Sequence, residues 1–338
     1  MTRKPPPPAA MFTLIAGRWV SHLLYIAAKL ELADHLAHGS RTTEELSATA
    51  GVQAPALYRV LRALASFGVF EETKGRRFKL TPLAATLQKS APNSMHAVAI
   101  LMGEPYLHEA WGQLLNGLNT GENSFFKAHG APLFEYLDRH PETVKIFSQA
   151  MASLSSTENP AVAAAYKFSG IRTIVDVGGG NGSLLAALLR ANPKLKGVHF
   201  DRPSVSALAK QAPHLTAKGV AERCTFESGD FFESVPKGGD AYIMKRVIHD
   251  WDDGQCARIL STCRSAMNNK GRVLVLETVI PQGNDPDRGK LLDIQMLVIG
   301  GRERTKKEFS TLFKDAGLKP TRFIPTKCPL SIVEGVRA

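Results

Sequence analysis

The spacing of apolar residues divides the first part of the chain into helices and a hairpin. Residues 11–38 place apolar side chains three and four positions apart, which predicts a long amphipathic helix. Residues 42–46 (Thr-Thr-Glu-Glu-Leu) form a capping box that predicts a short helix ending at Gly51, and a second helix begins at Pro55. Residues 69–80 predict a hairpin around a Lys-Gly turn. This order of elements is typical of a winged helix-turn-helix.

Strand and helix patterns alternate from residue 171 onward. The predicted strands are residues 174–177, 197–200, 224–227, 241–244 and 272–277. Such alternation predicts an α/β fold with a mostly parallel sheet and helices on both faces, in which ligands bind beyond the carboxyl ends of the strands. Two extended runs, residues 321–327 and 330–336, predict an antiparallel hairpin at the sheet edge.

These patterns predict four segments. Residues 1–10 form a disordered tail, residues 11–90 the winged-helix domain, residues 91–168 a mainly helical linker, and residues 169–338 the α/β domain. The stretch rich in Ser, Thr and Asn over residues 153–159 is a candidate hinge between them.

Composition places the chain among ordinary globular proteins. It has 338 residues, of which 44% are apolar and 22% charged. The first apolar segment is interrupted by Arg18, His22 and Lys29, so we expect neither a signal peptide nor a membrane span. The four cysteines form no Cys-x-x-Cys pair, which argues against structural zinc and a disulfide framework and favours a reducing cytoplasm.

The charge of the chain raises a second class of function. More than half of the net charge of +11 lies in residues 1–90, and Arg59 and Arg62 fall on the second helix of the predicted winged helix. Such a helix could read a DNA major groove. The alternative is a packing module that dimerises the chain, and the enzyme-like second half favours that interpretation.

A glycine-rich turn marks the candidate ligand site. Residues 171–182 run from a buried strand through Gly178, Gly180 and Gly182 into an apolar helix. Glycines let a ligand approach the backbone, and the helix start offers unpaired N–H groups. The spacing differs from that of dinucleotide enzymes, and Asp176 lies just before the turn. A carboxylate there suits a cationic ligand such as S-adenosylmethionine, although a plain strand-to-helix turn would look similar.

Polar residues follow the next strands. Asp201 ends the second strand, where a carboxylate can accept hydrogen bonds from ribose hydroxyls, and Asp230 beside Phe231 follows the third, where the pair could hold and stack adenine. His249 follows the fourth strand with Asp250 adjacent, and Glu277 ends the fifth. A histidine with a neighbouring carboxylate is suited to act as a general base. Each of these residues taken singly could also be structural.

With these residues the chain resembles the plant-type small-molecule O-methyltransferases, which include caffeic acid, isoflavone and hydroxyindole enzymes and bacterial antibiotic-pathway members. The resemblance covers nearly the whole chain. It is carried by residues 176–182 (Asp-Val-Gly-Gly-Gly-Asn-Gly), 200–203 (Phe-Asp-Arg-Pro), 229–232 (Gly-Asp-Phe-Phe), 249–251 (His-Asp-Trp) and 300–305 (Gly-Gly-Arg-Glu-Arg-Thr). It implies a Rossmann-like methyltransferase domain preceded by a winged-helix dimerisation domain, with acceptor-pocket residues in the linker.

The resemblance also implies roles for individual residues. Gly178 and Gly180 would line S-adenosylmethionine, with Asp201 on its ribose and Asp230 and Phe231 on its adenine. Further cofactor contacts are matched by Lys245, Trp251 and Ser155. The predicted cofactor site also includes Asp176, the carboxylate before the turn. His249 would be the base, flanked by Glu277, Glu303 and Asp250, with no metal. Met102, Met151, Met296 and Phe147 are assigned to the acceptor pocket, with simple core filling as the alternative for the methionines.

Two departures from the plant members limit what can be carried over. Gly103-Glu104-Pro105 follows Met102 where plant enzymes commonly have Asn, and Leu154 stands where some of them have histidine. The bacterial style of these segments points to a secondary metabolite.

We therefore predict methyl transfer from S-adenosylmethionine, leaving S-adenosylhomocysteine, to a hydroxyl of a phenolic, polyketide or phenazine-type molecule. The alternatives are N-methylation of a heteroaromatic ring and a DNA-binding regulator. We also expect a homodimer formed through the N-terminal domain, with Phe12 and Trp19 contributing to the partner's acceptor pocket. Neither nucleic acid nor a membrane is an expected partner, and the expected location is the cytoplasm.

Overall fold

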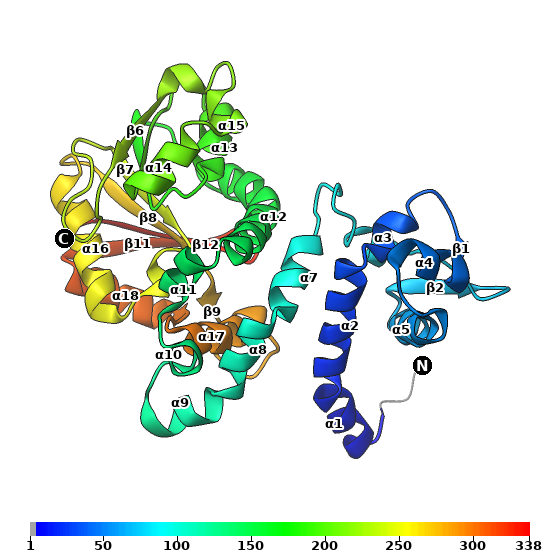
Figure 1. Cartoon of the computed structure of the whole chain (residues 1–338). Helices are drawn as coiled ribbons and strands as arrows, with labels where there is room; N and C mark the ends of the chain where they lie inside the picture. The colour runs from blue at the N-terminus through cyan, green and yellow to red at the C-terminus, as the bar shows by residue number, and fades with distance from the viewer. Residues whose placement is uncertain (1–4) are drawn as a thin grey trace. The chain divides into compact units, whose positions relative to one another are not determined.

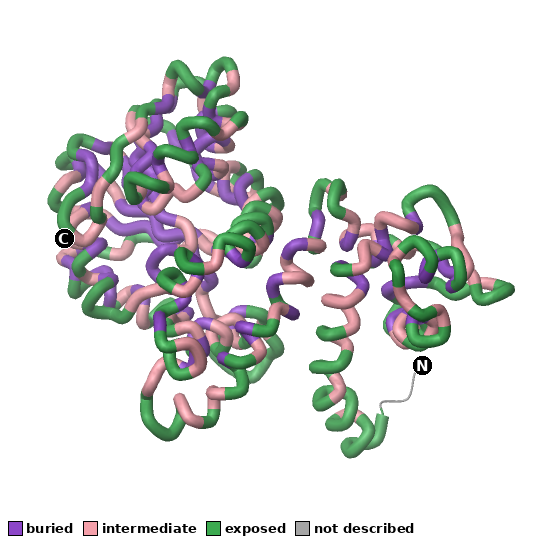
Figure 2. The backbone as a smooth tube through the Cα atoms, viewed as in Figure 1, coloured by how far each residue is buried: buried purple, intermediate pink, exposed green. Residues whose placement is uncertain are grey.

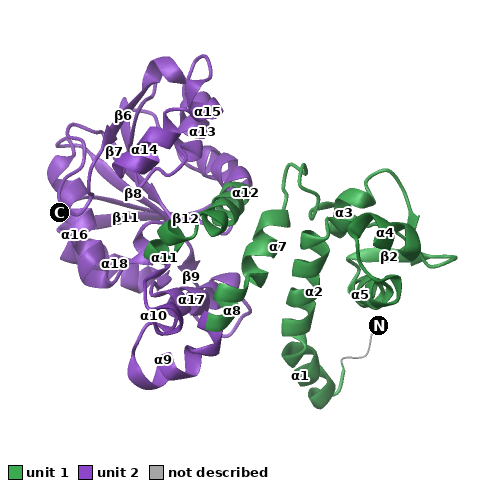
Figure 3. Ribbon diagram, in the orientation of Figure 1, with its two compact units in different colours: residues 1–109, 134–154 green, residues 110–133, 155–338 purple. Residues whose placement is uncertain are grey.

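The computed structural model describes residues 5–338 (Figure 1). The contacts within the chain separate two compact units (Figure 3). Unit 1 runs to Glu109 and includes Phe134–Leu154, whereas unit 2 consists of Ala110–Leu133 and Ser155–Ala338. Each unit is therefore built from segments that are not contiguous in sequence. The segment boundaries expected near residues 90 and 168 stay a prediction.

Unit 1 begins with three helices where one is predicted. These are α1 (Pro7–Ile15), α2 (Gly17–Lys29) and α3 (Leu32–His35). The chain breaks between α2 and α3 because Glu31 adopts the left-handed conformation, with φ of 52°. The tail predicted over residues 1–10 is wrong for Pro7 to Ala10, which are helical, and residues 1–4 lie outside the described part.

The winged helix forms as predicted. Its elements are β1 (Arg41–Thr42), α4 (Thr43–Ala50), α5 (Ala54–Ser66), β2 (Phe70–Thr73) and β3 (Arg77–Leu80), and the strands form an antiparallel sheet in the order β1-β3-β2. The capping box is present, because Thr42 Oγ1 accepts from Glu45 N at 3.1 Å and the Glu45 carboxylate accepts from Thr42 N at 2.7 Å. Gly51 ends α4 with φ of 69°.

The middle of the chain is mainly helical, as predicted. The helices are α6 (Pro82–Ala85), α7 (His96–Gly103), α8 (Pro105–Gly112), α9 (Leu114–Thr120), α10 (Ser124–His129), α11 (Leu133–Arg139) and α12 (Pro141–Ala165). Helices α2 and α7 pack closely, since a Cβ on Gly103 would lie 2.2 Å from the Tyr25 ring. Helix α12 passes from unit 1 into unit 2 at Ser155.

Unit 2 is built on a seven-stranded sheet with the order β11-β12-β8-β7-β4-β5-β6. The strands are β4 (Thr173–Val177), β5 (Lys196–Asp201), β6 (Cys224–Ser228), β7 (Ala241–Lys245), β8 (Arg272–Glu277), β11 (Leu318–Pro325) and β12 (Ser331–Arg337). Strands β8, β7, β4, β5 and β6 are parallel, and β12 and β11 add the antiparallel hairpin at one edge. The prediction of a mostly parallel sheet with a C-terminal hairpin is confirmed.

Helices cover both faces of this sheet because its strands alternate their apolar side chains. On β8, Leu274 and Leu276 pack with α13 (Ser183–Ala191) in one core, whereas Val273 and Val275 face α16 (Asp253–Ala266) and α18 (Lys306–Asp315) in the other. The central strands are buried on both sides (Figure 2). Helices α14 (Pro203–Ala209) and α15 (Pro213–Thr216) and the 3-10 turn η1 (Ala221–Arg223) connect β5 to β6.

A small parallel pair that the sequence did not predict lies beyond β8. Strands β9 (Val279–Ile280) and β10 (Arg304–Thr305) enclose helix α17 (Arg288–Ile299) in sequence. Because β9 follows Glu277 and β10 follows Glu303, this pairing brings the two carboxylates together.

The N-terminal helices expose a large apolar surface. Met11, Phe12, Leu14, Ile15 and Trp19 are each more than half exposed (Figure 2). By length and composition alone, the helical stretch Pro7–Lys29 would also be long and apolar enough to cross a membrane. Exposed apolar surfaces of this kind mark sites of interaction with another surface.

Candidate functional site

The glycine turn between β4 and α13 has a backbone that requires glycine. Gly178, Gly180 and Gly182 have φ of 68°, 56° and 75°, in the left-handed region. A Cβ on Gly178 would lie 2.8 Å from Val247, but a Cβ on Gly180 would meet no described atom within 4 Å. The turn thus has one open position, at Gly180, where a ligand can reach the backbone.

The end of β5 holds this turn in place. Phe200 O accepts from Gly178 N at 2.9 Å and from Gly179 N at 3.2 Å, and Asp201 Oδ2 accepts from Gly180 N at 2.8 Å. Each carboxylate oxygen can accept a second hydrogen bond, so Asp201 keeps acceptor capacity for a ligand. The structure therefore places Asp201 directly beside the open glycine.

The carboxylate of Asp176, just before the turn, is deeply buried. Its side chain is 2% exposed, and its Oδ2 has no hydrogen-bond partner among the described residues. Burial raises the pKa of Asp176 to about 6, against the opposing charges of His199 and Lys245. A buried carboxylate oxygen without a partner fits a site that a cationic ligand completes.

An aromatic cluster lies next to the turn. Phe231 and Trp251 meet edge to face with centroids 6.0 Å apart, and both pack on Phe232. Asp230 is exposed, and its Oδ1 accepts from Phe232 N at 2.8 Å. Phe231 also lies 3.9 Å from where a Cβ of Gly178 would be, so the predicted adenine contacts do lie beside the glycine turn.

Lys245 is held at the end of β7 by the C-terminal half of α12. Its Nζ donates to Ser155 Oγ at 2.6 Å and to Asn159 Oδ1 at 2.8 Å, and Glu158 lies 3.6 Å away. Asn159 Nδ2 in turn donates to Ser183 Oγ at 3.1 Å, in the first turn of α13. Burial lowers the pKa of Lys245, in spite of the nearby Glu158.

Sequence reasoning missed the adjacent ion pair of Arg246 and Glu158. Arg246 donates from both Nη2 and Nε to the Glu158 carboxylate, at 2.5 and 3.4 Å, and Glu158 is 2% exposed. Arg246 has φ of 55°, which is unusual for a non-glycine residue. A positive φ at arginine leaves no sequence signal, and the only available signal is the pair of successive cations, Lys245 and Arg246, at the end of a strand.

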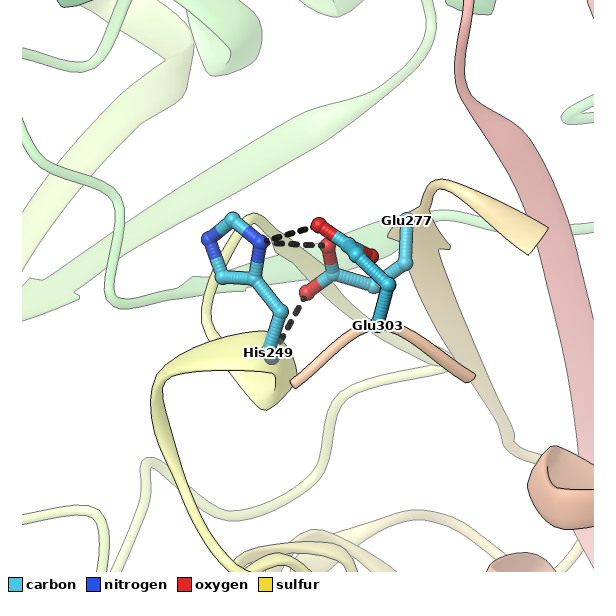
Figure 4. A group of neighbouring side chains, drawn as sticks. All are labelled: His249, Glu277 and Glu303. Atoms are coloured by element: carbon cyan, nitrogen blue, oxygen red, sulfur yellow. Dashed lines mark hydrogen bonds and ion pairs between the residues drawn. The ribbon is translucent and has the colours of Figure 1, made fainter. Parts of the chain in front are cut away.

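His249 lies among three carboxylates, as predicted, and two of them, Glu277 and Glu303, are drawn with it in Figure 4. It is in the 3-10 turn η2 (Ile248–Asp250), and its Nδ1 donates to Glu303 Oε1 at 2.8 Å, with Glu277 Oε2 at 3.6 Å. Glu277 Oε1 also accepts from Val247 N at 3.0 Å and His249 N at 3.3 Å. The other ring nitrogen, Nε2, points away from both glutamates and lies 3.6 Å from Asp250 Oδ1.

The electrostatics of this group follow from burial and like charge. Burial by itself would lower the pKa of His249, but Glu277, Asp250 and Glu303 together raise it to about 9. Burial raises the pKa of Glu277 to about 7 and that of Asp250 to about 6. Arg246, itself paired with Glu158, contributes an opposing positive charge to both acids.

The predicted acceptor residues fall in both units. Met296 on α17 is 3% exposed, and its Cε would lie 2.7 Å from a Cβ on Gly301, which also approaches His249 O. Met296 is therefore close to the His249 segment within unit 2. Met102, Met151 and Phe147 belong to unit 1, where Phe147 meets Phe134 edge to face, and their assignment to the acceptor pocket stays a prediction.

S-adenosylmethionine fits the residues at this sheet edge. The open glycine, the adjacent Asp201 carboxylate and the aromatic cluster with Asp230 match a ribose and an adenine, and the unpartnered Asp176 oxygen matches a cation. The fold and this site together define a methyltransferase.

Comparison with known proteins gives the family. Residues 111–319 match the model of the O-methyltransferase domain, and residues 12–90 match that of the O-methyltransferase dimerisation domain. The chain belongs to the family of S-adenosylmethionine-dependent O-methyltransferases, as the sequence resemblance predicted. Its N-terminal domain is accordingly a dimerisation domain of that family.

Individual relatives extend over nearly the whole chain. The phenazine O-methyltransferase PhzM of Lysobacter antibioticus is 45% identical over 96% of this chain and 94% of its own length. The crystal structure of LaPhzM superposes with a TM-score of 0.91 at 44% identity, covering 99% of this chain and 100% of that one. CalO1, a methyltransferase of calicheamicin biosynthesis solved with S-adenosylhomocysteine bound, has a TM-score of 0.89 at 36% identity and covers 98% of both chains.

Some of the relatives are N-methyltransferases by name. The phenazine-1-carboxylate N-methyltransferase of Pseudomonas aeruginosa is 31% identical over 97% of both chains. The family therefore includes both kinds of acceptor atom.

Within residues 5–338, one group of side chains could surround a metal ion by distance alone. His249, Glu277 and Glu303 each offer an atom, and these atoms lie within 4.8 Å of one another. We assign them to hydrogen bonding, because Nδ1 and Glu303 Oε1 are 2.8 Å apart, the distance of an ordinary hydrogen bond.

Proposed function

We propose that this enzyme methylates a hydroxyl group on the ring of an aromatic small molecule, with His249 as the general base. The single observation that carries the proposal is the geometry of His249. Its Nδ1 is occupied by Glu303 at 2.8 Å, and its Nε2 points away from both glutamates. The hydrogen bond from Nδ1 to Glu303 thus orients the imidazole ring, and Nε2 can accept a proton from the substrate.

The proposed mechanism assigns the proton to His249. A phenolic hydroxyl has a pKa near 10 and is a weak nucleophile at neutral pH. His249 Nε2 takes up its proton as the oxygen becomes methylated, and Glu303, Glu277 and Asp250 stabilise the imidazolium that forms. S-adenosylmethionine supplies the methyl group. General-base catalysis of this kind contributes roughly 10²–10⁴-fold, and correct positioning of the two substrates contributes the rest.

The cofactor roles that we propose follow the geometry of the sheet edge. Gly178, Gly180 and Asp176 form the turn, with Asp201 for the ribose and Asp230, Phe231 and Trp251 for the adenine. Lys245 and Ser155, which are hydrogen-bonded to each other at 2.6 Å, would lie at the opposite end of the cofactor, near its carboxylate. These positions belong to one unit, so the site does not depend on the placement of the other unit.

The acceptor that we propose is a phenolic, polyketide or phenazine-type secondary metabolite. Support comes from the relatives, whose names describe phenazine and antibiotic-pathway substrates. Buried Met296 beside the His249 segment suits a flat apolar ring, because a thioether packs well against aromatic faces.

The alternative is N-methylation of a heteroaromatic acceptor, as one relative's name indicates. A nitrogen with a free lone pair needs no base, whereas this chain retains the complete group of His249, Glu277 and Glu303. We therefore favour oxygen. The test is incubation of the enzyme with methyl-labelled S-adenosylmethionine and a panel of hydroxylated and non-hydroxylated phenazines and phenols, with NMR of the product. An O-methyl signal supports the proposal, and an N-methyl signal on acceptors that carry both groups contradicts it.

We also propose that two copies associate through unit 1. The exposed apolar side chains of α1 and α2 and the matched dimerisation domain support this arrangement. The winged helix would then pack rather than bind DNA. Arg62 and Arg76 both lie over the ring of Tyr58, at 5.6 and 4.7 Å from its centroid, so two of its arginines are engaged within the domain. We expect the enzyme to act in the cytoplasm.

A further inference from the structure

A histidine that the proposed mechanism does not use lies under the glycine turn. His199 is on β5, and its side chain is completely buried. Its Nε2 lies 2.9 Å from the carbonyl oxygen of Gly180, the open position of the turn. Because a carbonyl oxygen only accepts, Nε2 must carry the proton in this contact.

Gly180 is held at both of its backbone groups by β5. His199 binds its carbonyl oxygen, and Asp201 Oδ2 accepts from its N–H at 2.8 Å. The two side chains are two residues apart and therefore leave the strand on the same side. Between them, Phe200 O accepts from Gly178 N and Gly179 N. Three successive residues of one strand thus hold Gly178, Gly179 and Gly180.

The imidazole of His199 is itself closely packed. A Cβ on Gly179 would lie 2.8 Å from its Cδ2 and 2.9 Å from its Nε2, so only glycine leaves room for the ring. Its Nδ1 lies 3.5 Å from Ser206 Oγ on α14, and the Phe226 ring is 5.6 Å away. The ring has little freedom to turn, and its hydrogen bond can therefore set the position of the Gly180 peptide.

We propose that His199 is a positioning residue for the cofactor: its hydrogen bond fixes the Gly180 peptide so that the open face of the turn and the Asp201 carboxylate are presented together. The inference rests on the proposed cofactor roles of Gly180 and Asp201. Glycine in the left-handed region is conformationally free, so without an anchor on its carbonyl group this peptide would lose its defined orientation.

The test separates the hydrogen bond from the bulk of the ring. H199F keeps an aromatic ring but removes the N–H donor, and H199Q keeps a donor of similar reach. Calorimetric titration with S-adenosylhomocysteine measures binding without turnover. We expect H199F to raise the Kd about tenfold, because binding must then order a Gly180 peptide that the hydrogen bond fixes beforehand in the wild type. H199Q should recover most of the affinity, and kcat at saturating cofactor should change much less than the Kd in both variants.

Y242F is the matched control for lost stability. Tyr242 is buried in β7 of the same sheet, and its hydroxyl donates to the carbonyl oxygen of Pro236 and accepts from Gly239 N at 3.2 Å. This variant also removes a buried hydrogen bond to a backbone carbonyl, so it should lower the melting temperature without changing the Kd.

The outcomes distinguish an error in the role of His199 from an error in the proposed cofactor site. If H199F is folded and binds S-adenosylhomocysteine with the wild-type Kd, or if Y242F weakens binding equally, the positioning role of His199 is wrong. If D201N binds as tightly as the wild type, the proposed cofactor site is wrong, and the positioning role of His199, which rests on it, is wrong with it.

Discussion

His249 is buried beside three carboxylates, and its protonation decides when it can act as a base. Its pKa is raised to about 9 by Glu277, Asp250 and Glu303, which outweigh the lowering effect of burial. A base must be deprotonated, so kcat/KM for the acceptor should rise with pH, with an inflection near 9. Rate measurements between about pH 6 and 10.5 test this. E303Q should move the inflection to lower pH, and a wild-type profile that is flat over this range would contradict the assignment.

The same pKa shift has a consequence for stability. The pKa of His249 is higher in the folded protein than the ordinary value of 6.5, so the folded state binds this proton more tightly. Its contribution to stability is complete below about pH 6.5 and is lost as the pH rises through about 9. Denaturant unfolding of the wild type and H249Q at these two pH values should show a smaller difference between them at the higher pH. A difference that grows with pH would show that the imidazole is neutral in the folded enzyme.

Asp201 provides the corresponding test for cofactor binding. D201N keeps the size of the side chain but loses the charge that strengthens its hydrogen bonds. We expect the Kd for S-adenosylmethionine to rise about 10- to 100-fold, since hydrogen bonds to charged groups contribute about 1.5–3 kcal/mol. The matched control is D285N, in the exposed loop before α17, which should bind normally. Equal affinity in D201N and D285N would remove Asp201 from the site.

At the scale of elements, one face of α12 joins the cofactor turn to the segment that carries His249. Ser155, Glu158 and Asn159 lie on that face and bind Lys245, Arg246 and Ser183. E158Q leaves the partly buried Arg246 guanidinium without the paired charge of Glu158, which should lower the free energy of unfolding by about 3 kcal/mol. E135Q on α11 breaks an exposed pair with Arg139 and should cost less than about 0.5 kcal/mol. Denaturant titration distinguishes the two, and a similar small effect for both would contradict a structural role for the buried pair.

The sequence predicts elements well where a local signal specifies them. The capping box at Thr42 and Glu45, the apolar runs of the five parallel strands and the glycine turn all carry such signals, and each is confirmed. The prediction of one long N-terminal helix is wrong, because the chain breaks where Glu31 adopts a left-handed conformation. The spacing of apolar residues does not indicate this conformation. The pair β9–β10 was missed because two-residue strands leave no periodicity.

The sequence predicted the candidate-site residues that lie at the carboxyl ends of strands. Asp201, Asp230, Lys245, His249 and Glu277 follow successive strands, and parallel topology gathers their ends at one edge. Contacts that depend on packing were not predictable. In the sequence, His199 is not distinguishable from an ordinary buried strand residue, and Glu158 is not distinguishable from an ordinary polar residue on a helix. Burial of Asp176 was likewise not apparent from its place before the turn.

At the scale of the whole molecule, the exposed apolar side chains of α1 and α2 suggest a dimer. F12E/W19E should therefore give a monomer, whereas the wild type should have about twice the chain mass of 36.7 kDa. Light scattering after size-exclusion chromatography measures both. The matched control is L208E on α14, which charges an apolar residue of unit 2 that is more exposed than either Phe12 or Trp19 and should leave the dimer intact. A monomeric wild type with full activity would contradict the proposed association.

The most direct test of the account is single-turnover methyl transfer by H249Q and wild-type enzyme, with cofactor affinity measured on the same preparations. We predict a rate lower by roughly 10²–10⁴-fold, a cofactor Kd within about twofold of the wild type, and a smaller defect for more acidic phenols, which ionise without a base. A wild-type rate in folded H249Q, or a defect independent of acceptor acidity, would contradict the assignment of His249 as the base.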